Sequence, residues 1–339
     1  MIKLFEMFAG YGGASFALKK AGIEFECVGY SEIDKFAVQC YEQNHSGKNF
    51  GDCTAIDPRD LPDFDLLTGG FPCQSFSVAG KGLGERDTRG TQFHEIIRIA
   101  EVKKPRWILL ENVKGLVGKK HRATFDKIIS ELERIGYFVR WKVLNSKEHG
   151  IPQNRERVWI VCFKNMYEAV EFEYPEKEEL KLFLKDILED EVDDEYYLSD
   201  DQITKLHEKM TLILNTMQGG HRQPFIVASR GRNPLNPSDR TTGSPTEQRL
   251  EPKLGGTTNA LTTIQKDNWL LNENRIRKLT PCECFRLMGF LDDGINLQGL
   301  SNTQRYKLAG NGWDINVVSK IFNNLCNMKK EDNNDNIHM

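Results

Sequence analysis

The sequence predicts an α/β protein with a mostly parallel sheet, joined to a smaller and more irregular lobe. Short apolar runs alternate with amphipathic stretches through the first half of the chain, a pattern typical of βαβ units. The chain has 339 residues, of which 39% are hydrophobic, and this is enough for one large core and a second small domain. After Lys164 the regular alternation ends, and the composition becomes acidic and then rich in Gly, Pro, Asn and Arg.

The expected elements follow from the spacing of apolar residues. We expect strands over 2–8, 25–31, 64–68, 107–110, 138–144 and 157–163, and helices over 15–21, 35–43, 93–102 and 125–135. The acidic stretch predicts helices over 178–189 and 199–214, whereas 218–259 predicts loops. Helical spacing returns near Ile276, with Thr280 as the N-cap and Pro281 in the first turn, and a last helix covers 315–326.

Composition narrows the class of protein. No apolar run reaches the roughly 18 residues of a membrane span, and the first residues lack the apolar stretch of a signal peptide, so we expect a cytoplasmic protein. The eight cysteines are scattered, which favours free thiols. Cys282 and Cys284 form the only close pair, but they lack the spacing and partner ligands of a zinc site, so we expect no metal.

Charge is distributed unevenly along the chain. The net charge is −3, yet residues 168–201 contain fifteen acids and three lysines, whereas residues 202–280 contain twelve Lys or Arg against six Asp or Glu. The second segment is suited to a polyanionic partner, although a solvated basic face would have the same composition.

Reactive side chains stand at the ends of expected strands. Cys73 follows Pro72 just after one strand, Glu111 ends the next, and Arg155 and Arg157 flank the start of a later one. In an open α/β sheet, ligands bind outside the carboxyl ends of the strands. We therefore expect a thiol, a carboxylic acid and two guanidinium groups in one cleft.

A glycine-rich turn, Phe8-Ala9-Gly10-Tyr11-Gly12-Gly13, follows the first strand. A dinucleotide site needs G-x-G-x-x-G at this place, but the third glycine would fall at Ser15. The glycines suit a cofactor without phosphate, because they let the backbone approach it closely. Glu32, at the end of the second strand, can accept hydrogen bonds from ribose hydroxyls, and Asp52, at an expected third strand end, can accept one from an adenine amino group.

These motifs, taken in order with Gly310-Asn311-Gly312, resemble those of the DNA cytosine-5 methyltransferases of bacterial and phage restriction-modification type. The resemblance covers about residues 1–165 and 275–325. It implies a Rossmann-like S-adenosylmethionine-dependent methyltransferase domain over 1–167, completed by 303–328. It also implies a target-recognition domain over 168–302, and we expect residues 329–339 to form a disordered tail.

The resemblance implies methyl transfer from S-adenosylmethionine to carbon 5 of a flipped-out cytosine within a specific double-stranded DNA sequence, leaving S-adenosylhomocysteine. Cys73 would add to carbon 6 of the ring and form a covalent adduct, while Glu111 would protonate ring nitrogen 3. Arg155 and Arg157 would either grip the exocyclic oxygen or orient Glu111. The sequence does not identify the base that removes the carbon 5 proton, and we expect a bound water.

The resemblance also implies two sets of contacts. The expected cofactor contacts are Phe8, Ala9, Gly10, Tyr11, Gly12, Gly13, Glu32, Ile33, Asp52, Cys53, Pro72 and Asn311. The glycine-spaced loop after Cys73 has the composition of a lid that closes over a flipped base, and the central segment would read the DNA sequence. The expected DNA contacts are Ser75, Ser77, Lys81, Arg89, Arg222, Arg230, Arg232 and Arg240.

Three other functions remain open. A tRNA cytosine-5 methyltransferase would use the same chemistry, although the long central segment favours DNA. An NAD-dependent oxidoreductase is disfavoured by Ser15, and a catalytically dead DNA-binding subunit is disfavoured by the intact set of reactive residues. Trp313 departs from the family pattern, in which a small residue and then an aliphatic one follow the asparagine. We expect a monomer that either acts beside a cognate restriction endonuclease at the same DNA site or is an orphan or phage-borne equivalent; the sequence leaves both open.

Overall fold

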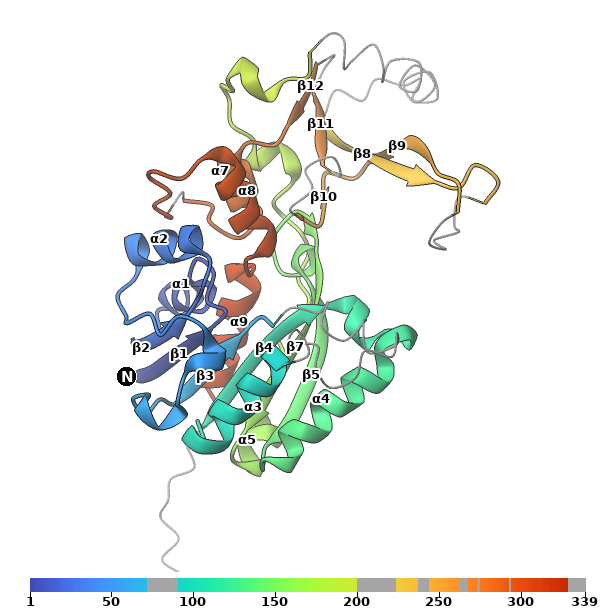
Figure 1. Ribbon diagram of the computed structural model, residues 1–339. Coiled ribbons are helices and arrows are strands. Elements are labelled where there is room, and N and C mark those ends of the chain that lie inside the picture. Colours follow the sequence, from blue (N-terminus) through green and yellow to red (C-terminus); the bar gives the residue numbers. More distant parts are fainter. Residues whose placement is uncertain are drawn as a thin grey trace, which may run out of the picture.

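The computed structural model describes residues 1–71, 91–199, 224–236, 244–262, 268–272, 275–292 and 294–328. Its main body is a six-stranded sheet in the order β2-β1-β3-β4-β7-β5 (Figure 1). The strands are β1 (Ile2–Met7), β2 (Phe25–Ser31), β3 (Leu66–Gly69), β4 (Trp107–Val113), β5 (Phe138–Asn145) and β7 (Glu156–Phe163). β1 pairs in parallel with β2 and β3, and β3 with β4, whereas β7 runs antiparallel to both β4 and β5. The predicted mostly parallel sheet is confirmed, with β7 as the reversed strand.

Helices cover both faces of this sheet because its strands alternate apolar side chains between the faces. One core contains Leu4, Leu66 and Leu109 together with residues of α1, α2 and α9. The other core contains Phe5 and Leu67 together with residues of α3 and α4. These helices are α1 (Gly13–Lys20), α2 (Lys35–Asn44), α3 (Thr91–Lys103), α4 (Arg122–Arg134) and α9 (Ile315–Cys326). The C-terminal helix therefore completes the layer that the N-terminal helix begins.

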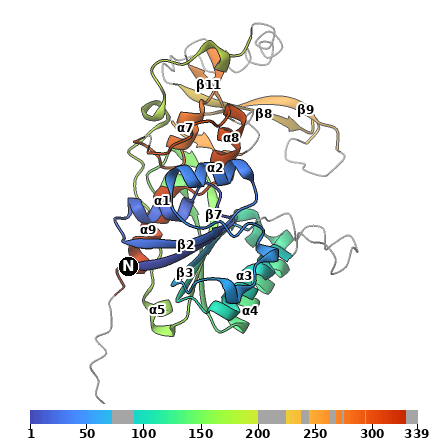
Figure 2. The ribbon, with the colours of Figure 1, turned by 60° about the vertical axis from the view of Figure 1, so that its left-hand side comes forward.

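The second part of the molecule contains an antiparallel four-stranded sheet in the order β12-β11-β8-β9. Its strands are β8 (Phe225–Arg232), β9 (Glu247–Lys253), β11 (Trp269–Asn272) and β12 (Arg275–Lys278). The β8–β9 pair extends away from the main sheet in both views (Figure 1, Figure 2). We expected loops over 218–259, and this expectation is wrong where β8 and β9 pair. β8 and β9 are consecutive antiparallel strands, and the Gly- and Arg-rich composition hides their strand pattern.

Two further helices link the two parts. α7 (Pro281–Arg286) begins at Thr280, whose side chain accepts a hydrogen bond from the backbone N–H of Glu283, so the predicted cap is confirmed. α8 (Asn302–Asn311) follows and packs against α7. The short strands β6 (Gln153–Asn154) and β10 (Thr258–Asn259) pair in parallel and tie the central segment to the main body.

The acidic stretch differs from the expectation. Instead of a helix over 178–189, the chain forms only the 3-10 turn η8 (Leu184–Ile187). The backbone N–H of Leu184 donates to the carbonyl of Gly256 and that of Glu178 to the carbonyl of Glu148, so long-range partners replace the local bonds of a helix. A short helix that we did not expect, α5 (Met166–Glu171), precedes this stretch. Residues 200–214 and the tail 329–339 lie outside the described residues.

The remaining short elements are 3-10 turns at the ends of strands and helices. They are η1 (Cys53–Ala55), η2 (Pro58–Asp60), η5 (Lys114–Val117), η6 (Lys119–His121), η7 (Ser146–Glu148) and η9 (Asp194–Tyr196). In the part of the chain that the structure describes, no helix has the length and apolar character to cross a membrane. Over the same residues there is no group of three or more His, Cys, Asp or Glu arranged to hold a metal ion.

Candidate active site

A cleft of about 460 Å³ opens where the parallel strands end. Its walls come from the turn after β1, the residues after β2 and β3, the end of β4, the start of β7 and the end of α8. The lining residues that carry the argument are Phe8, Gly10, Glu32, Glu111, Arg157 and Asn311. The structure thus brings the glycine turn, the expected carboxylic acid and an expected arginine into one continuous space.

The glycine turn has backbone angles that residues other than glycine adopt only with strain. Gly10 has φ 57° and Gly12 has φ 85°, both in the left-handed region, and a Cβ on Gly12 would lie 2.4 Å from the His45 ring. The N–H of Gly10 donates to Glu32 Oε2 at 2.9 Å, and the N–H of Gly12 donates to the carbonyl of Ala9. Because protein acceptors already occupy these amides, the turn offers a phosphate little to bind.

Glu32 anchors the end of β2 beside the turn. Its other carboxylate oxygen, Oε1, accepts hydrogen bonds from the N–H groups of Ile33 and Asp34 at 2.8 and 2.9 Å. Glu32 and Ile33 both line the cleft. The carboxylate is therefore held in a fixed orientation, with its remaining acceptor capacity available to a ligand.

Asp52 and Cys53 do not lie among the residues that line the cleft. Asp52 caps the turn η1 and accepts from the N–H and the hydroxyl of Thr54. The expected third strand end is absent at this place among the described residues, since only an isolated bridge joins Tyr30 and Asn49. Contact of Asp52 and Cys53 with a cofactor stays a prediction.

Glu111 and Arg157 form a mostly buried ion pair. The Nε of Arg157 lies 2.8 Å from Glu111 Oε1, and the two side chains are 16% and 12% exposed. The antiparallel register sets Val113 opposite Arg157 and Glu111 opposite Trp159, so the reversed strand β7 carries the guanidinium to the acid. Burial raises the pKa of Glu111, and the charges of Arg157 and then Arg155 oppose the rise.

Arg155 has a different environment. It is only 3% exposed, and its guanidinium donates to the carbonyls of Leu261 at 3.0 Å, Gly312 at 2.8 Å and Gly310 at 3.4 Å. Burial lowers its pKa to about 10, which keeps it charged near neutral pH. Arg155 therefore joins the central segment and the end of α8 to the main sheet.

Asn112 fixes the chain at the edge of the cleft. Its Nδ2 donates to the carbonyl of Phe71 at 2.9 Å, and both Asn112 and Phe71 line the cleft. Phe71 is the last described residue before the segment that contains the expected nucleophile. Six of the predicted site residues in 72–90 and two in 221–243 lie outside the described residues: Pro72, Cys73, Ser75, Ser77, Lys81, Arg89, Arg222 and Arg240.

Arg230 and Arg232 lie on β8, in the part that extends from the main body (Figure 2). Arg232 forms an ion pair with Glu251 of β9, and the Nη1 of Arg230 lies 3.5 Å from the same carboxylate. This pairing orients both guanidinium groups along the β8–β9 hairpin. Neither residue lines the cleft.

Sequence reasoning missed Glu6 and the setting of Trp313. Glu6 is buried in β1, beside a cavity of about 40 Å³ that also touches the glycine turn. Its carboxylate accepts from the hydroxyls of Ser15 and Tyr41 and from the N–H of Ala14, and burial raises its pKa to about 7. An acid between the apolar residues Phe5 and Met7 of the strand was the available signal.

Trp313 packs its ring edge-on against Trp159, with centroids 5.1 Å apart. A Cβ on Gly13 would lie 3.0 Å from its Cβ, and one on Gly70 would lie 2.9 Å from its Nε1. The carbonyl of Trp313 accepts from the Tyr11 hydroxyl. Gly13 at the start of α1 and Gly70 just after β3 thus make room for this indole, which lines the small cavity beside the turn.

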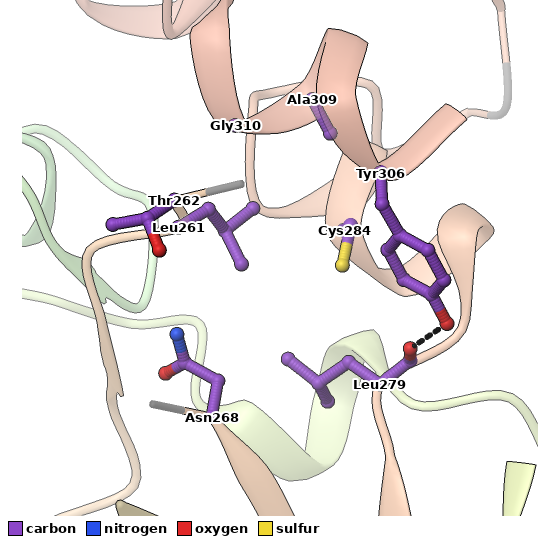
Figure 3. Close-up of a pocket in the computed structure, with 8 residues that line it drawn as sticks. All are labelled: Leu261, Thr262, Asn268, Leu279, Cys284, Tyr306, Ala309 and Gly310. Carbon is purple, nitrogen blue, oxygen red and sulfur yellow. Dashed lines mark hydrogen bonds between the residues drawn. The ribbon is translucent and has the colours of Figure 1, made fainter. Parts of the chain in front are cut away.

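Figure 3 shows a second cavity, of about 20 Å³, between α7, α8 and the central segment. It is lined mainly by apolar groups, and the Tyr306 hydroxyl donates to the carbonyl of Leu279 at its edge. Leu261 and Gly310, whose carbonyls bind Arg155, also line it. This cavity belongs to the packing between the two parts of the molecule.

Comparison with known proteins gives a consistent result. Residues 2–327 match the family model "C-5 cytosine-specific DNA methylase". The type II methyltransferase M.Bsp6I of Bacillus sp. (strain RFL6) is 36% identical, covering 96% of this chain and 98% of the relative. The type II methyltransferase M.HhaI of Haemophilus parahaemolyticus is 35% identical, covering 96% and 94%.

Solved structures show the same fold at lower identity. The Entamoeba histolytica methyltransferase EhMeth superposes with a TM-score of 0.69 at 16% identity, covering 97% of this chain and 99% of that one. S. pombe Dnmt2 methyltransferase superposes with a TM-score of 0.65 at 20% identity, covering 96% and 98%. At these identities the likeness concerns the fold alone.

Proposed function

Because the chain belongs to the C-5 cytosine-specific DNA methylase family, we propose that Cys73, Glu111 and Arg157 form the centre with which it methylates DNA. The protein is a DNA cytosine-5 methyltransferase. The observation that supports the proposed residues is the Glu111–Arg157 pair, which faces the same cleft as Phe71, two residues before Cys73.

The chemistry assigns a distinct task to each group. Carbon 5 of cytosine is a weak nucleophile until a thiolate adds to carbon 6, and this is the task of Cys73. As negative charge develops on ring nitrogen 3, an acid must donate a proton or a strong hydrogen bond there, and this is the task of Glu111. Burial, which raises the pKa of Glu111, favours the protonated form that the task requires.

The two arginines have separate tasks in this proposal. Arg157 orients Glu111 through the 2.8 Å contact and faces the cleft, where it can also meet the exocyclic oxygen of the base. Arg155 is a positioning residue, because its hydrogen bonds go to three backbone carbonyls. The sequence left open whether these arginines grip the exocyclic oxygen of the base or orient Glu111. In this proposal both tasks belong to Arg157, and Arg155 positions the backbone.

The cleft fits S-adenosylmethionine better than a dinucleotide. The amides of the turn donate to protein acceptors, and the carboxylates of Glu32 and Glu6 lie beside it, which disfavours a pyrophosphate and suits a cation. We propose that Phe8, Gly10, Glu32, Ile33 and Asn311 hold this cofactor, with Glu32 accepting from the ribose hydroxyls. When bound, the cofactor supplies the methyl group as an activated sulfonium.

DNA is the substrate of the family, and a stacked cytosine must leave the duplex to reach a cleft of this kind, at a cost of a few kcal/mol. We propose that residues 168–302 form the target-recognition domain and that 1–167 with 303–328 form the catalytic domain. Arg230 and Arg232 are proposed DNA contacts. The other proposed contacts lie outside the described ranges and are Ser75, Ser77, Lys81, Arg89, Arg222 and Arg240. We further propose a monomer that works in the bacterial cytoplasm, with a restriction endonuclease as its partner.

The test is transfer of a tritiated methyl group from S-adenosylmethionine to plasmid DNA, with tRNA as the competing acceptor, followed by bisulfite sequencing. The proposal expects label in duplex DNA and modified cytosines within one short sequence motif. Label in tRNA alone would favour the RNA enzyme. The absence of modified cytosine in the plasmid, with folded protein, would defeat the proposal.

A further inference from the structure

A small cavity, distinct from the cleft, also borders Glu111. It has a volume of about 10 Å³ and is lined by Glu111, Ser146, Arg155, Arg157 and Asp314, with apolar walls from Leu144, Trp159 and Val317. This volume is about that of one water probe, and several polar groups border it, which are the two conditions for a buried water site. Glu111 therefore contacts both the cleft and this cavity.

Asp314 presents an unused carboxylate oxygen to this region. It is the N-cap of α9, and its Oδ1 accepts from the N–H groups of Asn316 at 2.9 Å and Val317 at 3.4 Å. The side chain is 3% exposed. Its Oδ2 is buried and has no hydrogen-bond partner among the described residues. A cap needs only one oxygen, so capping leaves the second oxygen unexplained.

The neighbouring charged groups do not satisfy that oxygen. Arg155 donates to backbone carbonyls, Arg157 contacts Glu111, and the Tyr11 hydroxyl donates to the Trp313 carbonyl. His149 adds no positive charge, because burial lowers its pKa. Burial raises the pKa of the Asp314 carboxyl, opposed first by a hydrogen bond from the Ser146 side chain and then by the N–H groups that Asp314 caps. Two carboxyl groups in low-dielectric surroundings therefore border one cavity.

We propose that Asp314 is a positioning residue that shares a proton with Glu111 through one water in this cavity. The inference rests on the proposed function of Glu111 as the acid. A proton leaves Asp314 for the water while the water gives one to Glu111, so the water is regenerated and the pair keeps its total charge. The path runs through this cavity, which is distinct from the cleft proposed to hold the base.

The discriminating variant is Asp314→Asn. Asparagine caps a helix as well as aspartate does, so the melting temperature is expected to stay unchanged, but the variant can neither titrate nor repel charge on Glu111. The readout is the single-turnover rate of methyl transfer to plasmid DNA as a function of pH, with full-length enzyme in excess. Asp314→Ser, which also caps a helix well and has no carboxyl group, controls for effects that are particular to the asparagine side chain.

In the wild type, the rate is expected to fall at alkaline pH as the pair loses its proton. Without the second carboxyl group, the charges of Arg155 and Arg157 act on Glu111 unopposed. The alkaline limb should move to lower pH by about one unit, which is about tenfold in rate on that limb, while the rate below the limb is unchanged. Asp314→Glu, which keeps the carboxyl group but caps poorly, should lower the melting temperature and leave the limb near its wild-type position.

Three outcomes would contradict these proposals. If both Asp314→Asn and Asp314→Ser give the wild-type pH profile, the shared proton is refuted and Asp314 is only a cap. If Glu111→Gln retains the wild-type rate, the proposed function of Glu111 fails instead, whatever the Asp314 variants show. A uniform rate loss with a lowered melting temperature in the Asn and Ser variants also overturns the inference, because a structural role then explains it.

Discussion

Replacing each arginine of the pair by methionine separates two tasks that sequence alone could not divide. In Arg155→Met, the carbonyls of Leu261, Gly310 and Gly312 lose the donors they meet at 3.0, 3.4 and 2.8 Å. Each buried carbonyl left without a donor costs about 1 kcal/mol. We therefore expect a loss of about 3 kcal/mol in the free energy of unfolding and, for a chain of 339 residues, a fall of about 4 °C in melting temperature.

Arg157→Met is the matched control. It leaves Glu111 without its cation, but burial already raises the pKa of that acid, so Glu111 becomes neutral and the loss of stability stays below about 1 kcal/mol. The variant also removes the contact that orients Glu111, and this loss is expected to lower the single-turnover rate by about 100-fold.

The assays are urea unfolding at neutral pH and single-turnover methyl transfer at saturating DNA and cofactor. The account requires the larger stability loss in Arg155→Met and the larger rate loss per molecule of folded enzyme in Arg157→Met. The reverse order, with Arg155→Met stable but inactive and Arg157→Met unstable but active, would refute the assignment of the two residues.

Three further predictions concern other buried or basic groups. The pKa of Glu6 is raised to about 7. Its contribution to the free energy of unfolding is therefore fully present below the pKa that Glu6 has in the unfolded chain, and it is lost as the pH rises through 7. Glu6→Gln should reduce the loss in unfolding free energy between pH 5 and pH 8 by about 2 kcal/mol, and equal pH dependence in both proteins would contradict this. Glu283→Gln removes the carboxylate that lies 2.6 Å from the buried guanidinium of Arg277, so Arg277 stays charged without a partner. The free energy of unfolding in urea should fall by about 3 kcal/mol, whereas the control Arg275→Gln, at an exposed ion pair, should change it little. Arg232→Ala should weaken DNA binding at low salt and reduce the slope of log affinity against log salt by about one, so an unchanged slope in fluorescence titrations would exclude a phosphate contact.

The main six-stranded sheet and its helices follow from local patterns, and this is why the sequence predicts them well. The strands Ile2–Met7 and Phe25–Ser31 and the helix Ile315–Cys326 agree closely with the expected ranges. Their apolar spacing is strong, and their partners are chain neighbours or buried faces. The antiparallel direction of β7 cannot be predicted from that spacing, because the pattern of apolar residues is the same in a parallel and an antiparallel strand.

The expectations fail where distant partners decide the structure. The backbone N–H groups of Leu184 and Glu178 donate to the carbonyls of Gly256 and Glu148, so an acidic stretch of helical composition forms a 3-10 turn and no α-helix. The residues of the proposed site show the same limit. The sequence placed Glu111 at a strand end, but the partners of Arg155 lie 106 and 157 residues away, and the cavity that Asp314 borders exists only after folding.

The central claim is that Cys73 bonds covalently to the base while the cleft around Glu111 supports the addition. The most direct test uses duplex DNA in which cytosine is replaced by 5-fluorocytosine, which has no removable proton at carbon 5, together with S-adenosylmethionine. The account predicts a protein–DNA species that survives denaturing electrophoresis for the wild type and is absent for Cys73→Ser. A covalent species of equal yield in Cys73→Ser, or none in an active wild-type enzyme, would contradict the account.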